Sequence, residues 1–191
     1  MLMKVSKRGG IKLLNVTFVM PKTGIRKATL SDLPEMVGIY NDAVALGGIT
    51  CDIDLFTIEE RIPWFDVHQT AEYPLFVYEV DGEVAGYSHL SAYRAGRRAV
   101  EKVAEISYYV NKKFRKQGIG SALVSHTINH AKELGYDHLM AMIVEGNLGS
   151  ENMLLKYGFN QWGRMPRIAV FNGNTHDHIY YGLSFEQYKS L

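Results

Sequence analysis

The sequence is short of cysteine, because Cys51 is the only one among 191 residues. A single thiol cannot close an internal disulfide, and no further cysteines stand at metal-ligand spacing. This excludes a disulfide-stabilised secreted scaffold and suits the reducing cytoplasm, where we expect the protein to be located. Since no catalytic histidine pattern accompanies it, Cys51 is expected to be a buried or half-buried apolar residue and not a nucleophile.

An excess of charge of either sign is also missing. The chain carries 21 Lys and Arg residues against 20 Asp and Glu residues, which gives a formal net charge of +1. A protein so balanced has no global field that gathers nucleic acid or an anionic membrane surface, and neither is expected as a partner. An anionic ligand must therefore be bound by a local site.

Long apolar runs are absent too. Lys4, Lys7 and Arg8 precede a partly apolar stretch over residues 11–20, but polar residues interrupt it and no small-residue cleavage site follows. A secretory signal needs an unbroken apolar stretch, and a membrane helix needs about twenty apolar residues. We expect residues 1–23 to form a flexible N-terminal arm and residues 24–191 to form a single domain.

Strand-like and helix-like patterns alternate from residue 24 onward, without repeats or low-complexity tracts. This alternation predicts one α/β domain. Asp81-Gly82 indicates a tight hairpin, which makes the flanking strands antiparallel neighbours. Strands are expected at residues 25–29, 73–80, 83–91, 103–110, 138–144, 167–171 and 179–185. Helices are expected after the capping and proline signals of residues 31–35, and at residues 58–69, 119–134 and 150–156.

The histidines do not indicate a metal site. His176 and His178 flank Asp177 at positions read as extended, just before the strand expected at residues 179–185. We expect their imidazoles to point away from each other and not to converge on a metal ion. No metal is predicted.

The connection from residue 111 to residue 120 carries the strongest chemical signal. Gly118 and Gly120 open the expected helix there and let the backbone approach a ligand with no Cβ in the way. The first amides of a helix lack intrahelical acceptors, and the aligned peptide dipoles leave positive charge beside them, so the segment favours a phosphate. Four cations add to the local field: Lys112, Lys113, Arg115 and Lys116. Taken alone, the glycines fit an ordinary turn into a helix equally well.

Two common phosphate motifs are not met by this connection. It lacks the Gly-Lys-Ser/Thr ending of a nucleoside triphosphate loop, and it lacks the three glycines and the later ribose-binding acid of a dinucleotide fingerprint. Nucleoside triphosphates and nicotinamide cofactors are therefore disfavoured.

In its motifs the sequence resembles the GNAT acetyltransferase superfamily. Arg115, Gly118 and Gly120 match the family pattern of Arg or Gln, two residues, Gly, one residue, then Gly or Ala, and Asn147 with Ser150 resembles its second cofactor motif. The resemblance implies that acetyl-coenzyme A binds with its pyrophosphate on the glycine loop, its pantetheine arm at the asparagine and its acyl carbonyl on the amide of Val110. The residues implied to bind this cofactor are Tyr108, Val110, Arg115, Lys116, Gln117, Gly118, Ile119, Gly120, Ser121, Asn147, Ser150 and Lys156.

More narrowly, residues 25–183 are similar to the phosphinothricin and methionine sulfone N-acetyltransferases, with matching sequence segments at residues 39–44 and 82–87. This likeness implies the GNAT fold, an α/β arrangement of a central twisted sheet of about seven strands, mixed but mostly antiparallel, flanked by about four helices. It also implies a homodimer and a small-molecule amine as acceptor.

Glu105 is the candidate general base. An alkyl amine is largely protonated at physiological pH and must lose a proton before it attacks a thioester. The resemblance places the catalytic glutamate at Glu105, and the amide of Val110 would then steady the oxyanion. From residue types alone, a solvated glutamate paired with Lys102 or Arg98 is an alternative.

The general acid is not assigned by the sequence. Seven residues after Asn147, where the family places a tyrosine or a histidine, stands Leu154. Tyr157 follows three positions later and is expected to serve in packing. Solvent or another tyrosine would then protonate the coenzyme A thiolate.

Tyr93, Arg94 and Arg97 are candidate contacts for the acceptor. They lie between the strands expected at residues 83–91 and 103–110, where related enzymes approach the acceptor's acidic groups. Arginine grips carboxylate and phosphinate oxygens in a bidentate manner. A solvated basic loop is the alternative.

The leading hypothesis is an N-acetyltransferase that transfers acetyl from acetyl-coenzyme A to the α-amino group of a small amino-acid-like acceptor, of the phosphinothricin, methionine sulfone or methionine sulfoximine type. Two alternatives stay open: acetylation of a peptide or protein terminus, and a non-catalytic acyl-coenzyme A sensor. Leu154 favours the sensor, and Glu105 opposes it.

Overall fold

The computed structural model describes residues 23–185, so nearly all of the predicted N-terminal arm lies outside the described residues. Within that range the chain forms one seven-stranded sheet in the order β1-β2-β3-β4-β5-β7-β6. The strands are β1 (Gly24–Lys27), β2 (Leu75–Val80), β3 (Glu83–Ala92), β4 (Val103–Val110), β5 (His138–Val144), β6 (Asn160–Phe171) and β7 (Asn174–Ser184). The α-helices are α1 (Leu33–Leu46), α2 (Ile58–Val67), α3 (Ile119–Glu133) and α4 (Leu148–Lys156).

The sheet is mixed and mostly antiparallel, as predicted. Every neighbouring pair runs antiparallel except β4 and β5, which are parallel. Asp81 and Gly82 turn β2 into β3 with φ angles of 52° and 87°, and the positive values at both positions are those a tight primed hairpin turn requires. The predicted hairpin is confirmed.

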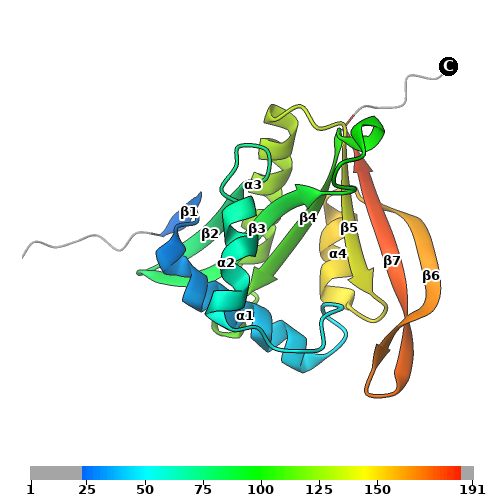
Figure 1. The fold of residues 1–191 in the computed structure, drawn as a ribbon, viewed down its shortest axis with the longest axis horizontal. Helices are drawn as coiled ribbons and strands as arrows, with labels where there is room; N and C mark the ends of the chain where they lie inside the picture. Colours follow the sequence, from blue (N-terminus) through cyan, green and yellow to red (C-terminus); the bar gives the residue numbers. More distant parts are fainter. Residues whose placement is uncertain (1–22, 186–191) are drawn as a thin grey trace, which may run out of the picture.

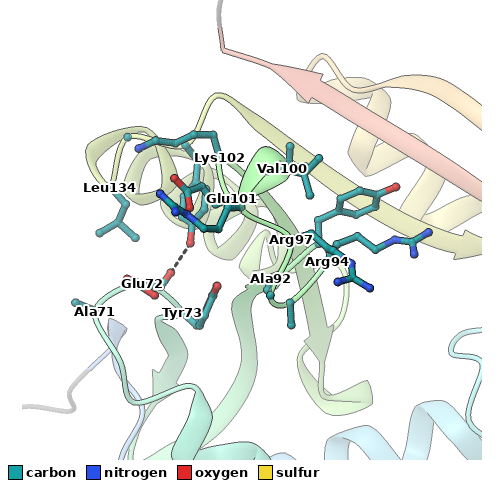
Figure 2. Close-up of a pocket in the computed structure, with 17 residues that line it drawn as sticks. Ala71, Glu72, Tyr73, Ala92, Arg94, Arg97, Val100, Glu101, Lys102 and Leu134 are labelled. Atoms are coloured by element: carbon teal, nitrogen blue, oxygen red, sulfur yellow. Dashed lines mark hydrogen bonds between the residues drawn. The ribbon is translucent and has the colours of Figure 1, made fainter.

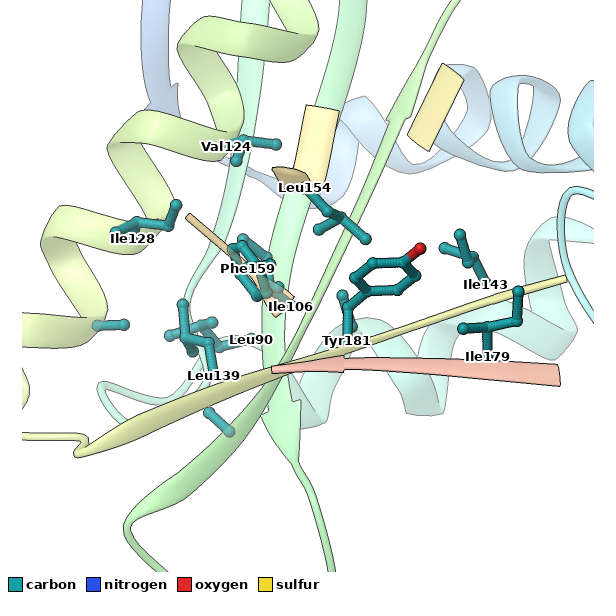
Figure 3. Close-up of a cluster of buried hydrophobic side chains, with 13 residues drawn as sticks. Leu90, Ile106, Val124, Ile128, Leu139, Ile143, Leu154, Phe159, Ile179 and Tyr181 are labelled. Atoms are coloured by element: carbon teal, nitrogen blue, oxygen red, sulfur yellow. The ribbon is translucent and has the colours of Figure 1, made fainter. Parts of the chain in front are cut away.

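Two layers of helices enclose the sheet (Figure 1), with α1 and α2 on one face and α3 and α4 on the other. Successive strand residues point to opposite faces, and the two sides accordingly receive alternate residues of β3 and β4. Tyr87 packs with α1 and α2 in one buried cluster, while Leu90 and Ile106 pack with α3 and α4 in another. Figure 3 shows Leu154 and Phe159 among the side chains of the second cluster. No helix within residues 23–185 is long and apolar enough to cross a membrane.

The closing hairpin differs from its prediction. Strands were expected only at residues 167–171 and 179–185, but β6 and β7 are longer and start earlier. Gly163 and Pro166 obscure the pattern of β6, and its pairing with β7 shifts register twice, between Gln161 and Gly163 and between Met165 and Ala169. Proline and register breaks are tolerated because β6 is an edge strand.

Two side-chain predictions were wrong. His176 and His178 are two residues apart in β7, so they share a face of the strand and do not point away from each other. Within the described range no group of three or more His, Cys, Asp or Glu residues is placed to hold a metal ion. Cys51 is exposed, because residues 47–57 form an irregular connection between α1 and α2 that leaves it outside the core.

Candidate active site

The sheet opens between β4 and β5. Their parallel ladder covers three positions, Val103 with His138, Ala104 with Leu139 and Glu105 with Met140. Beyond Glu105 the two strands separate, and residues of β4, β5 and α4 line a cavity of about 50 Å³ between them. We call this space the β4–β5 gap.

Backbone amides of β4 point into the β4–β5 gap. The amide of Asn111 donates to the Ala85 carbonyl at 3.0 Å, and the amide of Tyr93 donates to the Val103 carbonyl at 3.5 Å. An antiparallel ladder bonds every second residue, so odd-numbered residues of β4 are bonded to β3. The N–H groups of Tyr108 and Val110 therefore face the gap, where β5 offers no partner.

The start of α3 presents a second group of free amides. Gly118 caps the helix at φ 83°, a conformation that a side chain would strain. The first helical bond runs from the amide of Ala122 to the carbonyl of Gly118 at 2.9 Å. The amides of Ile119, Gly120 and Ser121 precede this bond and so lack an intrahelical acceptor.

The second glycine of the loop brings α3 close to β4. A Cβ on Gly120 would lie 3.3 Å from Cγ2 of Val110 and 3.6 Å from Cε of Met153. A small residue at this position therefore lets the helix start close beside the gap-facing amides of β4.

The cations of the loop divide into two pairs. Lys112 lies 3.3 Å from Asp42 and Lys113 lies 2.6 Å from Glu83, so both are ion-paired at the surface. Arg115 and Lys116 are exposed and form no ion pair within residues 23–185. These two cations remain for a ligand at the start of α3.

The predicted cofactor residues of α4 lie beside α3. Oδ1 of Asn147 accepts from the amide of Ser150 at 3.2 Å and caps α4. Nζ of Lys156 donates to Oγ of Ser121 at 2.8 Å. The hydroxyl of Tyr157 donates to the Ser121 carbonyl at 2.7 Å. The structure thus brings both predicted cofactor motifs together, and Tyr157 binds α3 in addition to packing on the core.

Leu154 lines the β4–β5 gap. Its side chain is fully buried among Val124, Ile143 and Tyr181 (Figure 3). An aliphatic side chain cannot donate a proton. The hydroxyl of Tyr108 lies beside the same cavity, donates to the Ser150 carbonyl at 3.4 Å, and has its pKa raised by burial.

Glu105 stands where β4 and β5 part. Its side chain is half-buried and its carboxyl group forms no hydrogen bond or ion pair within residues 23–185, so the alternative pairing with Lys102 or Arg98 is not formed. Burial raises the pKa of its carboxyl group to about 7. A base with a pKa near the working pH is well matched to taking a proton from an amine.

Glu105 lines a second cavity of about 280 Å³, which we call the Glu105 cavity. The two cavities are neighbours, because they share four lining residues: Ile49, Ser107, Tyr109 and Met142. Other walls come from α1, α2, β3 and the exposed connection that holds Cys51. Desolvation and the Asp52 carboxylate raise the pKa of the Cys51 thiol, so it is a poor nucleophile at neutral pH.

Sequence reasoning missed the contribution of α2 to this cavity. Arg61 and Trp64 both line it, and His68 follows on the same face of the helix. The guanidinium of Arg61 lies 4.1 Å from the ring centroid of Trp64. The i, i+3 and i+7 spacing of three chemically active residues is a signal that could have found them.

Two histidines tie α2 to the sheet. Nδ1 of His68 is 2.7 Å from the Trp64 carbonyl, and its Nε2 is 2.9 Å from Oγ of Ser91. Oγ of Ser91 is 3.2 Å from Nδ1 of His89, which lines the Glu105 cavity. Burial lowers the pKa of both imidazoles, so both are neutral at pH 7.

Tyr93, Arg94 and Arg97 do not line the Glu105 cavity. They line a different cavity of about 500 Å³, whose walls include Leu134 and whose lining does not include Glu105. Figure 2 shows Arg94 and Arg97 extending away from Lys102 and Leu134. Both arginines are exposed, and their predicted contact with the acceptor stays a prediction.

An opened parallel pair, a helix start with free amides and a half-buried carboxyl group together suit a group-transfer enzyme that binds a phosphate-bearing cofactor. Comparison with known proteins identifies the family: residues 37–159 match the acetyltransferase (GNAT) family, and the chain belongs to it. The protein is therefore an N-acetyltransferase, and its acetyl donor is acetyl-coenzyme A.

Individual relatives agree with this assignment. The chain is 37% identical over 154 residues to YwnH of Bacillus subtilis (strain 168), which carries the name of a phosphinothricin acetyltransferase. The match covers 80% of this chain and 93% of YwnH. An L-methionine sulfoximine/L-methionine sulfone acetyltransferase of Pseudomonas aeruginosa is 30% identical, with 87% of this chain and 96% of the relative covered. A crystal structure of a phosphinothricin acetyltransferase from Sinorhizobium meliloti in complex with AcCoA superposes with a TM-score of 0.80 at 27% identity, covering 85% of this chain and 88% of that chain.

Proposed function

We propose that this enzyme acetylates the α-amino group of a small amino-acid-like acceptor of the phosphinothricin, methionine sulfone or methionine sulfoximine type. The names of the similar relatives support this acceptor class. The observation that carries the proposal is Glu105, a half-buried and unpaired carboxyl group in a cavity that borders the β4–β5 gap.

In the proposed reaction Glu105 removes the proton from the acceptor's ammonium group. Its pKa of about 7 means that near neutral pH a substantial fraction is ionised and able to accept a proton. Acetyl-coenzyme A supplies the acetyl thioester that the neutral amine attacks. General-base help of this kind is worth roughly 10²- to 10⁴-fold in rate.

The gap-facing amides of β4 are proposed to receive the negative charge on the acetyl oxygen and to hold the pantetheine arm. A strand rises about 3.4 Å per residue, so Tyr108 lies about 10 Å along β4 from Glu105 and Val110 about 17 Å. The shorter separation favours the amide of Tyr108 for the acetyl oxygen, although the family resemblance had suggested Val110. The amide of Val110 then suits the pantetheine arm.

The start of α3 is proposed to bind the pyrophosphate. Free amides, the helix dipole and the unpaired cations Arg115 and Lys116 all favour an anion there. The remaining predicted contacts are proposed to surround the coenzyme from the loop, α3 and α4: Gln117, Gly118, Ile119, Gly120, Ser121, Asn147, Ser150 and Lys156.

We further propose that the enzyme works as a homodimer in the cytoplasm. The edge strand β6 exposes large apolar side chains, which is unusual unless a partner covers them. These side chains are Trp162, Met165, Ile168 and Val170. Light scattering at micromolar protein should give twice the mass of one chain, and a monomer at all concentrations would contradict this part of the proposal.

The acceptor class is tested by a thiol-release assay with acetyl-coenzyme A. The panel contains phosphinothricin, methionine sulfone, methionine sulfoximine, common amino acids, polyamines and short peptides. We expect turnover with the first three, and selective turnover of peptides would contradict the proposal.

The role of Glu105 is tested by Glu105→Gln. We expect kcat to fall roughly 10²- to 10⁴-fold while the affinity for coenzyme A is unchanged, because the side chain acts on the amine and not on the coenzyme. A wild-type protein that binds acetyl-coenzyme A but turns over no amine would instead identify a sensor.

A further inference from the structure

The guanidinium of Arg61 is held among three aromatic rings without a carboxylate partner. It lies 4.8 Å from the ring centroid of Tyr40, 5.0 Å from that of Phe56 and 4.1 Å from that of Trp64. Within residues 23–185 it forms no hydrogen bond and no ion pair. Stacking on rings fixes the direction of the planar group but leaves its N–H donors free.

Arg61 and Glu105 line the same cavity. The other carboxylate in that cavity, Asp52, accepts a hydrogen bond from the hydroxyl of Tyr40 and does not pair with Arg61. The cavity therefore contains one unpaired cation, together with a base that can take an ammonium proton. This pairing of signs matches the two charged groups of an α-amino acid.

We propose that Arg61 binds the α-carboxylate of the acceptor and so selects amino acids over simple amines. This inference rests on the proposed function, since it assigns the acceptor's acidic group to α2. It also separates that role from Arg94 and Arg97, which are exposed and line the other cavity. Because a planar guanidinium binds a carboxylate through two parallel hydrogen bonds, Arg61 is a specificity-determining residue.

The test compares methionine sulfone with the amine that lacks only its carboxyl group, 3-(methylsulfonyl)propan-1-amine. We expect the wild-type enzyme to favour methionine sulfone in kcat/KM. Arg61→Met should lower kcat/KM for methionine sulfone about 10- to 100-fold, the loss of a charge-assisted bidentate contact, and should change kcat/KM for the amine less than about threefold. Arg61→Lys should recover part of the preference, because it keeps the charge and loses the planar fork.

Arg98→Met is the matched control, since Arg98 is an exposed arginine outside the Glu105 cavity. It should keep the wild-type preference. Arg94→Met tests the alternative that Arg94 binds the acceptor's carboxylate. Loss of the preference in Arg94→Met with its retention in Arg61→Met would overturn the proposal, as would a wild-type enzyme that acetylates both compounds equally well.

Calorimetric titration of both compounds into the protein saturated with coenzyme A separates this inference from the proposed function. If no amine is acetylated, but methionine sulfone binds the wild type at least tenfold more tightly than Arg61→Met, the inference holds and the acceptor assignment fails. If methionine sulfone neither binds nor is acetylated, both fail. If Arg61→Met does not fold, the proposal is tested by titrating both compounds into the wild type and into Arg61→Lys. Equal affinity of the wild type for the two compounds overturns the proposal.

Discussion

At the scale of single residues, Glu105 places a reactive group at a cost in stability. Its carboxyl group has a pKa of about 7 in the folded protein against an ordinary value of 4.5, and burial is the cause. The folded state therefore binds a proton more tightly than the unfolded state. The stabilisation of the folded state by this tighter proton binding is fully present below pH 4.5 and is lost as the pH rises through 7.

Glu105→Gln should remove this pH-dependent loss, because glutamine does not titrate. The difference in melting temperature between the variant and the wild type is expected to grow in the variant's favour from pH 5 to pH 8. At pH 8 the corresponding difference in the free energy of unfolding is on the order of 2–3 kcal/mol. Thermal melts of both proteins across that pH range measure it. A constant difference between the two proteins would show that Glu105 has an ordinary pKa.

Gly86 in β3 has no room for a side chain against β4 and α3. A Cβ there would lie 2.7 Å from the carbonyl oxygen of Tyr109 and 3.2 Å from Cδ1 of Leu123. Since the nearest atom is backbone, Gly86→Ala should destabilise the fold by about 1–3 kcal/mol in denaturant titrations. Gly38→Ala in α1 is the control, because no atom lies within 4 Å of the new methyl group, and it should stabilise by about 0.5–1 kcal/mol.

Residue-level prediction succeeded where a local motif fixes a local geometry. Gly118 and Gly120 identified the helix start correctly, because a left-handed cap favours glycine and a close helix approach favours a small residue. The same reasoning missed the enclosure of Arg61. Spacing along α2 relates Arg61 only to Trp64, and the other two rings come from α1 and from the connection to α2. Residue-level reasoning also misjudged Cys51, whose exposure is decided by the path of that connection.

At the scale of elements, α2 depends on its first turn. Thr57 and Glu60 form a capping box: Oγ1 of Thr57 accepts from the amide of Glu60 at 3.2 Å, and Oε2 of Glu60 accepts from the amide of Thr57 at 2.7 Å. Thr57→Ala should cost about 1 kcal/mol of stability. It should also raise the KM for the acceptor more than for acetyl-coenzyme A, because α2 carries Arg61. Thr175→Ala, at an exposed position of β7 outside the Glu105 cavity, should leave both KM values unchanged.

The strand β4 has two kinds of amide, and hydrogen exchange can tell them apart. The amides of Tyr109 and Asn111 are bonded to β3 and should exchange slowly with or without ligand. The amides of Tyr108 and Val110 face the β4–β5 gap and should exchange faster in the free protein, then slow by at least tenfold when coenzyme A is added. Equal protection of all four amides in the free protein would contradict the opened sheet.

For the molecule as a whole, the fold class followed from alternation and from the Asp81-Gly82 hairpin, both of which act locally. The early part of β6 was missed because Gly163 and Pro166 disguise an edge strand that is defined by pairing with distant β7. The opening between β4 and β5 is likewise a property of the assembled sheet. No segment of the sequence encodes it separately.

The opened sheet predicts that coenzyme A stabilises the entire molecule. The two sides of the sheet are bonded through only three residue pairs between β4 and β5, and a ligand that bonds to both the β4 amides and α4 adds cross-links between them. Coenzyme A at 100 times its Kd should add about 2.7 kcal/mol, a rise in Tm of roughly 5–10 °C for a domain of this size. Pantetheine at the same concentration lacks the pyrophosphate and should give a much smaller shift. If the two shifts are equal, the start of α3 contributes nothing to binding and the assignment of the phosphate loop is wrong.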